Sequence, residues 1–317
     1  DDVLCFDDTP HVLIAGTTGS GKSTLLRMMV ATLALNTSPD ALRLYLVDLK
    51  NEDLLPFARL PHVETTAITR QQAMDVVRFM HAEKNRRVLE GKAHGPRCVL
   101  VVDELAQIAD KSTLLLLDET LAVARSKRLN AIFATQKPTV DVVGRLGKAN
   151  LTTRLVGRVT TADEATTATG RGETGAHLLP GRGAFLRVEG ADVTRLQAYW
   201  LDDDGTEAMV DAAVERWGRK VAVPVYQYSD DAISAPYWPT PQREIVGGTS
   251  GTRAVQPVQV VRSVPVAVGA RWPIPDRPLT ATEAAMVRRM YGGGLPQGRS
   301  KNSVITEVWG DLSNKPK

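Results

Sequence analysis

Eight residues near the start of the chain, Gly16 to Ser23, read Gly-Thr-Thr-Gly-Ser-Gly-Lys-Ser. The apolar run His11–Ala15 precedes them, and the run Thr24–Val30, which has the character of a helix, follows. A strand, a glycine-rich loop and a helix in this order form a phosphate-binding P-loop, G-x-x-x-x-G-K-[ST]. The alternative is a Gly/Ser-rich turn that matches by chance, but every fixed position is filled and both flanks fit. The motif therefore predicts a nucleotide-binding α/β fold.

The P-loop gives each of its groups a task. Glycines let backbone N–H groups turn toward a β-phosphate, and the start of the following helix adds its positive dipole end. The Lys22 ammonium reaches the β- and γ-phosphates, and the Ser23 hydroxyl binds Mg²⁺. We therefore predict ATP and Mg²⁺ as cofactors. The predicted nucleotide-binding residues are Gly16, Thr17, Thr18, Gly19, Ser20, Gly21, Lys22, Ser23 and Thr24.

Composition limits the class of protein. With 317 residues, 43% hydrophobic and 24% charged, the chain is typical of soluble globular proteins of one large domain or two. No apolar stretch approaches the roughly 20 residues of a membrane span. Cys5 and Cys98 lack metal-ligand spacing and read as reduced thiols, which favours a cytoplasmic location. Because the chain begins at Asp1 without a methionine, the sequence leaves open a membrane tether ahead of it.

Residues 1–220 alternate short apolar runs with helical stretches. Continuous runs such as Cys98–Val102 fit strands that are buried on both faces, as in a parallel sheet covered by helices. The predicted strands are 11–15, 42–48, 97–103, 130–135, 151–159 and 183–188. The predicted helices are 22–35, 70–90, 112–126, 140–147 and 205–217. The pattern predicts a P-loop NTPase domain with a mostly parallel central sheet.

The composition changes after residue 221. Nine of the chain's 18 prolines fall between Pro224 and Pro278, which predicts an extended linker over 221–278. Helical order returns over 279–317. This segment has six basic and three acidic residues, and their difference equals the net charge of +3 of the whole chain. Three glycines, Gly292 to Gly294, separate two short predicted helices. This tail is either helix-turn-helix-like and DNA-binding, through Arg299, Lys301 and Asn302, or a helical hairpin for packing or docking.

A second run of residues predicts hydrolysis. The apolar strand that ends at Val102 is followed by Asp103 and Glu104, a Walker B pattern. Asp103 would hold the Mg²⁺ shell, and Glu104 would orient and deprotonate the attacking water. A strand that ends in a solvated acidic turn is the alternative.

Two other strand ends carry polar residues. Asp48 ends the run Leu46–Val47, where a strand-end salt bridge is the simple explanation. Thr135 and Gln136 end the run Ile132–Ala134; Gln136 would lie beside the γ-phosphate, and a plain strand cap is the alternative. We predict Lys22, Asp103, Glu104 and Gln136 as catalytic residues.

These segments, in this order, resemble the FtsK/SpoIIIE family of DNA translocases. The resemblance covers about residues 10–202 and is most specific at Ala134-Thr135-Gln136-Lys137-Pro138-Thr139-Val140-Asp141-Val142-Val143, followed by Lys148–Arg154. It implies a RecA-like ATPase that assembles as a homo-hexameric ring and pumps double-stranded DNA through its channel. A compact motor with an unorthodox tail is more similar to versions from mobile elements, conjugative systems or phages. That last step is analogy.

The resemblance also assigns positions. It places Arg125 where the family has an arginine finger that reaches the ATP of the neighbouring subunit, with Arg154 as a second candidate; a solvated helix-end cation is the alternative for Arg125. The loops around Arg145 to Lys148 and Arg171 to Arg182 are candidates for DNA contact, because their Lys and Arg side chains would bind phosphates; solvated surface loops are the alternative. Asp48-Leu49-Lys50 departs from the family's Asp-Pro-Lys, and Val159-Thr160-Thr161 has no arginine after it until Arg171.

Three functions are consistent with these features. The first is ATP-driven translocation of double-stranded DNA in segregation, conjugation or phage and plasmid movement. The second is a related ATPase that drives protein export, as in type VII secretion, and it would hydrolyse ATP independently of DNA. The third is a non-motor P-loop enzyme, which would be active as a monomer.

Overall fold

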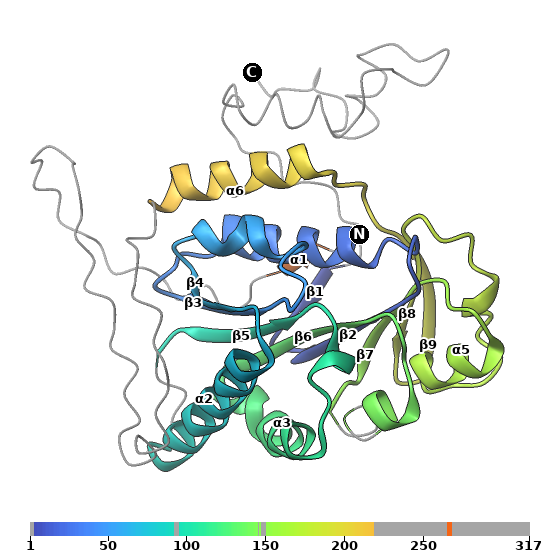
Figure 1. Ribbon diagram of the computed structural model, residues 1–317, viewed down its shortest axis with the longest axis horizontal. Helices are drawn as coiled ribbons and strands as arrows, with labels where there is room; N and C mark the ends of the chain where they lie inside the picture. The colour runs from blue at the N-terminus through green and yellow to red at the C-terminus, as the bar shows by residue number, and fades with distance from the viewer. Residues whose placement is uncertain (1–2, 92–94, 145, 147–149, 219–264, 268–317) are drawn as a thin grey trace, which may run out of the picture.

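An eight-stranded sheet runs through the middle of the molecule between two layers of helices (Figure 1). The computed structural model describes residues 3–91, 95–144, 146, 150–218 and 265–267. The strands follow the order β4 (Val63–Ala67), β3 (Leu42–Val47), β5 (Arg97–Val102), β6 (Leu129–Thr135), β2 (His11–Ala15), β7 (Thr153–Val156), β8 (Ala184–Glu189) and β9 (Asp192–Gln197).

All pairings from β4 across to β7 are parallel, whereas β8 and β9 are added antiparallel at one edge. The expected mostly parallel α/β architecture is therefore confirmed. Parallel strands bury both faces, and the chain supplies two layers of helices to cover them. The carboxyl ends of the six parallel strands meet at one edge of the sheet, where open α/β folds bind their ligands.

Helices α1 (Lys22–Asn36) and α6 (Asp203–Trp217) cover one face, and α2 (Arg70–Leu89) and α3 (Lys111–Ala124) cover the other (Figure 1). Alternate strand residues divide between the two cores. Ile14 and Ile132 pack toward α1 and α6, whereas Leu13 and Phe133 pack toward α2 and α3. A third cluster lies around the short helix α5 (Ala162–Thr169) and strand β8.

Side-chain caps fix where the helices begin. The Thr69 hydroxyl accepts a hydrogen bond from the Gln72 amide and forms a capping box at α2. Asp110 and Asp202 accept amide hydrogen bonds at the starts of α3 and α6. Hydrogen bonds from the Ser112 and Thr113 hydroxyls, with the backbone bonds adding to them, hold the pKa of the Asp110 carboxyl well below its usual value. By contrast, α1 begins without a side-chain cap and without an acidic residue in its first turn.

The structure corrects several sequence expectations. The strand expected over 151–159 is limited to β7, because the chain then turns through Gly157 and Arg158 toward the P-loop. The helix expected over 140–147 is a five-residue π-helix, Val140–Gly144, in the described part of that segment. The expected linker contains β10 (Pro265–Ala267), which pairs antiparallel with β1 (Val3–Cys5). The predicted tail, 279–317, lies outside the described residues.

Candidate nucleotide-hydrolysis site

Four neighbouring parallel strands bring their polar ends to one edge of the sheet. β6 lies between β2, which leads into the P-loop, and β5, which leads into Asp103 and Glu104. β3 lies beyond β5 and leads into Asp48, whereas β6 itself ends at Thr135. Residues from four distant parts of the sequence therefore meet around the start of α1.

The P-loop is held by backbone hydrogen bonds on both sides. The amide of Gly16 donates to the Thr135 carbonyl at 3.2 Å, and the amide of Thr17 donates to the Arg158 carbonyl at 2.9 Å. On the other side, the amides of Arg182 and Gly183 donate to the carbonyls of Gly19 and Ser20 at 3.0 and 2.8 Å. These bonds hold the loop in the shape in which successive backbone amides can bind an anion.

Gly21 cannot be replaced without strain. Its φ is +98°, and a Cβ at this position would lie 2.7 Å from the amide nitrogen of Gly183. Gly21 is also the residue before the first turn of α1, where no side chain caps the orphan amides. An uncapped helix start next to a glycine loop is a ready-made phosphate site.

Lys22 and Asp103 form a buried ion pair in the floor of the site. The Lys22 Nζ donates to the Asp103 Oδ1 at 2.7 Å and to the Asp103 carbonyl at 3.1 Å. Burial raises the pKa of Asp103, the Lys22 ammonium opposes that rise, and the charges of Asp53 and Asp48 add to it. The pair keeps the Lys22 ammonium in place next to the P-loop amides.

Glu104 is held by the end of the neighbouring strand. Its Oε1 accepts a hydrogen bond from the Thr135 hydroxyl at 2.7 Å, and its Oε2 accepts one from the backbone N–H of Gln136 at 2.9 Å. The side chain of Gln136 lines the cavity in front of the P-loop. The carboxylate expected to activate water is therefore bonded to the backbone of a residue whose side chain lines the cavity.

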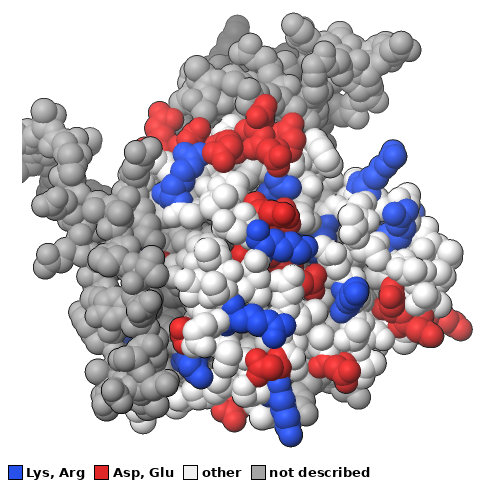
Figure 2. All heavy atoms as spheres, viewed as in Figure 1, with Lys and Arg blue, Asp and Glu red and all other residues white. Residues whose placement is uncertain are grey.

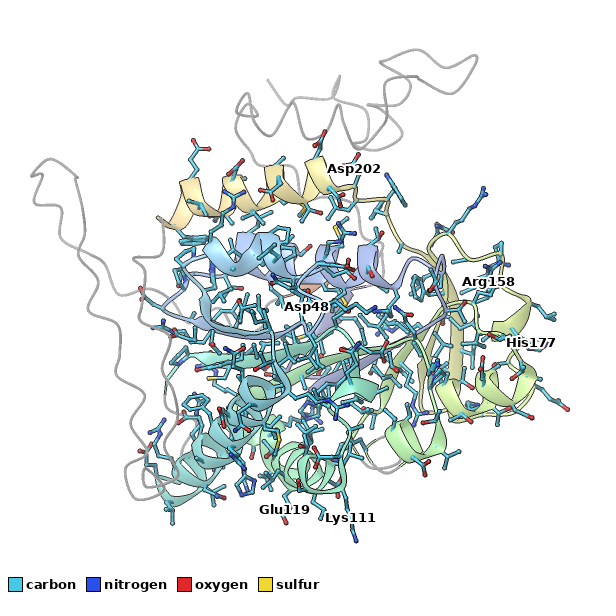
Figure 3. All side chains as sticks on the ribbon, viewed as in Figure 1. Asp48, Lys111, Glu119, Arg158, His177 and Asp202 are labelled. Carbon is cyan, nitrogen blue, oxygen red and sulfur yellow. The ribbon has the colours of Figure 1, made fainter. Side chains whose placement is uncertain are left out.

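Asp48 has a structural task that differs from the expected strand-end salt bridge. Asp48, which is labelled in Figure 3, is 1% exposed. Its carboxylate accepts four backbone hydrogen bonds, from Lys50, Asn51, Glu52 and Leu54. These bonds fold residues 49–54 into a compact loop. The loop presents Asp53, whose Oδ2 accepts a 2.5 Å hydrogen bond from the Ser23 hydroxyl. No sequence motif pointed to Asp53, because its loop meets the P-loop only in the folded structure.

The cavity at the P-loop has a volume of about 590 Å³. Thr17, Thr18, Gly19, Gly21, Lys22, Ser23 and Thr24 line one side, and Gln136, Arg182, Gly183, Gln197, Ala198, Tyr199 and Trp200 line the rest. Seven of the nine predicted nucleotide-binding residues line it. Gly16 and Ser20 lie behind them within the loop. This volume lies in the usual range for small-molecule sites.

Trp200 is a part of the cavity that sequence reasoning missed. It is 68% exposed, although a large aromatic side chain is normally buried. It lies three residues after Gln197. The side-chain Nε2 of Gln197 donates to the Arg182 carbonyl at 2.9 Å and so connects this wall of the cavity to the P-loop side. An exposed indole at the open end of a phosphate cavity is suited to stack on a nucleobase.

Replacing Trp200 with alanine is expected to weaken ATP binding about tenfold, because base–aromatic stacking contributes roughly 1–3 kcal/mol. The rate at saturating ATP should be nearly unchanged, since the reacting phosphates lie elsewhere. Equilibrium titration with a fluorescent ATP analogue checks the affinity, and Trp200→Phe is the matched control that keeps an aromatic face. Equal affinities for the wild type and Trp200→Ala would contradict a stacking role.

Arg125 and Arg154 occupy different surroundings. Arg125 follows α3 at the amino end of β6, so the seven residues of that strand separate it from the P-loop edge by about 20 Å. Its Nε donates to the Asp7 carbonyl at 2.9 Å, and its side chain is exposed. Arg154 is buried and donates to the carbonyls of Leu151, Thr167 and Ala168. Only Arg125 is therefore positioned to meet another molecule.

The expected DNA contacts are described only in part. The residues at 145 and 147–149 lie outside the described ranges, as do Arg299, Lys301 and Asn302. Within 171–182, the guanidinium of Arg171 donates to the Gly190 carbonyl at 2.8 Å, and Arg182 borders the nucleotide cavity.

The oxygen donors of the site fit Mg²⁺. Ser23 contributes a hydroxyl and Asp103 contributes a carboxylate, the hard donors that Mg²⁺ prefers, and Asp53 accepts the hydrogen of the Ser23 hydroxyl. Among the residues that the structure describes, no three acidic, thiol or imidazole side chains converge tightly enough to hold a metal by themselves. That arrangement suits Mg²⁺ bound with a nucleotide, which keeps several waters and takes ligands from phosphates.

Comparisons with known proteins agree with this geometry. A model of the FtsK/SpoIIIE family matches residues 3–90. The DNA translocase FtsK of Staphylococcus epidermidis is 29% identical over 241 residues, which cover 66% of this chain and 30% of that protein. The chain thus spans about a third of the length of the curated relative that it matches.

Two solved structures share the fold. The pCW3 conjugation coupling protein TcpA, in a monomer form with ATPγS, has a TM-score of 0.55 and 24% identity over 67% of this chain and 66% of its own. The cytoplasmic domain of the Thermomonospora curvata type VII secretion ATPase EccC has a TM-score of 0.54 and 26% identity over 62% of this chain and 24% of its own. In the described part of this chain, no helix is both long and apolar enough to cross a membrane.

Proposed function

We propose, on the premise that the chain belongs to the FtsK/SpoIIIE family, that it is an ATPase motor which moves double-stranded DNA. The observation that supports hydrolysis is the Glu104 carboxylate, held at the end of β6 by Thr135 and by the backbone N–H of Gln136, whose side chain lines the cavity of the P-loop. Support for DNA as the substrate comes from the relatives named DNA translocase FtsK.

The residues of the site divide the chemistry among them. The amides at the start of α1 and the Lys22 ammonium bind and neutralise the phosphates of ATP. Ser23 and Asp103 would hold Mg²⁺, which neutralises charge on the phosphate oxygens when it is bound. Glu104 orients a water and takes its proton, and Gln136 faces the same cavity from the end of β6.

The position of Arg125 supports an assembly of several copies. Since it lies at the edge of the sheet opposite to its own P-loop, it can approach a nucleotide only in a neighbouring subunit. A ring in which the amino edge of one subunit faces the P-loop edge of the next would complete each site. We propose a homo-hexamer, following the resemblance to ring-shaped DNA translocases.

Surface charge narrows where DNA would bind. Acidic side chains gather over α6 (Figure 2), where the helix carries Asp203, Asp204, Glu207 and Asp211. This face would repel DNA phosphates. The loop that includes Arg171 and Arg182 lies apart from it, beyond β7, and is the better candidate for phosphate contacts.

A protein-export ATPase is the second candidate. The observation that favours it is the shared fold and 26% identity with the type VII secretion ATPase EccC. Such a motor would hydrolyse ATP at a rate that double-stranded DNA does not change.

One experiment separates the two candidates. ATP hydrolysis by the 317-residue chain is measured with and without double-stranded DNA, and Lys22→Ala supplies the background. We expect strong stimulation by duplex DNA that is lost in Lys22→Ala, because a motor couples phosphate chemistry to its track. A rate that needs Lys22 but ignores DNA would contradict DNA translocation and favour protein export.

A further inference from the structure

Asp53 is an acidic residue that no part of the predicted motifs explains. Its Oδ2 accepts a 2.5 Å hydrogen bond from the hydroxyl of Ser23, the P-loop residue expected to bind Mg²⁺. Its Oδ1 lies 3.4 Å from the guanidinium of Arg27. The Asp53 side chain is 21% exposed, so most of it is enclosed.

A serine hydroxyl has one hydrogen to donate and two lone pairs to offer. When its oxygen binds a cation, a lone pair points to the cation and the hydrogen must point elsewhere. In this structure that hydrogen points to Asp53. A carboxylate that accepts it fixes the rotation of the hydroxyl and makes its oxygen more basic, as outer-shell partners do for other metal ligands.

We propose that Asp53 is a positioning residue for Mg²⁺: it orients the Ser23 hydroxyl and thereby raises the affinity of the nucleotide site for the cation. Asp53 acts through Ser23 and need not touch the metal or the nucleotide. The inference rests on the proposed nucleotide site and adds a residue to it.

The fold holds Asp53 in place from two directions. The Asp48 carboxylate organises the loop through bonds to amides on both sides of Asp53, those of Glu52 and Leu54. Arg27 lies one helical turn after Ser23 on α1, so both residues face the loop. Arg27 also pairs with Asp203 at 2.5 Å, at the start of α6. The Asp48-organised loop and the contact with Arg27 limit the rotamers that Asp53 can adopt, whereas Asp203 contacts only the other guanidinium nitrogen of Arg27.

The test measures cation affinity directly. A fluorescent ADP analogue is bound to the full chain, and Mg²⁺ is titrated in; binding of the same analogue is also measured in EDTA. Asp53→Asn is expected to raise the Mg²⁺ concentration at half-effect about tenfold or more, the usual cost of losing an outer-shell partner. Analogue binding in EDTA should be unchanged, because the amides and Lys22 remain.

A double-mutant cycle identifies the route of the effect. Ser23→Ala should weaken Mg²⁺ binding, and adding Asp53→Asn to it should change nothing more, because the hydroxyl that Asp53 orients is gone. Asp203→Asn is the matched control: it also removes a partner of Arg27, but its side chain is 92% exposed and belongs to α6, outside the loop that holds Asp53. It should leave Mg²⁺ binding at the wild-type value.

Three outcomes would overturn the proposal. The first is that Asp53→Asn weakens Mg²⁺ binding as much in the Ser23→Ala background as it does alone. The second is that Asp53→Asn weakens binding of the ADP analogue in EDTA as much as it does with Mg²⁺. The third is that Asp53→Asn binds Mg²⁺ with wild-type affinity. If Asp53→Asn melts at a lower temperature, Asp53→Glu keeps the acceptor and should bind Mg²⁺ more tightly than Asp53→Asn does. A wild-type chain that binds no nucleotide at all would instead defeat the proposed function, so the two failures are distinguishable.

Discussion

Replacing Glu104 with glutamine is expected to lower the rate of ATP hydrolysis by about 10³-fold, within the range typical of a lost general base. Glutamine has the shape of glutamate but cannot take a proton from water. The Thr135 hydroxyl can reverse its hydrogen bond to accept from the new amide group, so the side chain should keep its place. Single-turnover hydrolysis with radiolabelled ATP measures the loss.

ATP binding separates this effect from a damaged site. Because the substitution leaves the P-loop amides and Lys22 intact, Glu104→Gln should bind a fluorescent ATP analogue with nearly wild-type affinity. The variant would then trap the bound state, which is useful for observing assembly on DNA. A Glu104→Gln chain that hydrolyses ATP at more than about a tenth of the wild-type rate would show that another group takes the proton.

Replacing Arg125 with alanine is expected to reduce turnover by about 10³-fold, the lower end of the range for an arginine that stabilises phosphoryl transfer in trans. ATP binding should persist, since the arginine lies at the opposite edge of the sheet from its own P-loop. Steady-state hydrolysis in the presence of DNA is the measurement. Lys127→Ala removes a cation from the same turn and should keep near wild-type turnover, which controls for a general loss of surface charge.

Mixing two inactive variants tests whether the arginine acts between subunits. A Lys22→Ala subunit has no working P-loop but offers an intact Arg125, and an Arg125→Ala subunit has the reverse. Interfaces that combine the two intact parts should recover part of the activity. Mixtures as inactive as either variant alone would place the role of Arg125 within its own subunit or outside catalysis.

The parts of the site that the sequence predicted are those with local causes. A P-loop is one continuous segment of chain. Its parts here are an apolar strand, the glycine Gly21 with a φ of +98°, and the lysine next to it. Asp103 and Glu104 follow directly from an unbroken apolar strand. The predicted bounds of β2, β3, β5 and β6 are close to the observed ones, because a strand that is buried on both faces is a continuous apolar run in the sequence.

What the sequence did not predict depends on contacts between distant segments. Asp53 reaches Ser23 only because Asp48 folds its loop, and Trp200 borders the cavity only because the end of β9 is tied to the Gly183 region. β4 and β9 were not predicted either. They lie at the two edges of the sheet, where half-exposed strands mix polar and apolar residues and lack a continuous apolar run.

The central place of β2 has a consequence for the order in which the molecule is made. Its strand partners come late: His11 pairs with Ala131, and Val12 pairs with Thr153, 120 and 141 residues further along the chain. At a synthesis rate of about 5–20 residues per second, the run His11–Ala15 waits roughly 7–30 s for both neighbours. Until then an apolar strand with two open edges stands exposed, a state prone to aggregation. A nascent chain that stops before β7 should therefore need a chaperone and bind no nucleotide, although it already contains the whole P-loop.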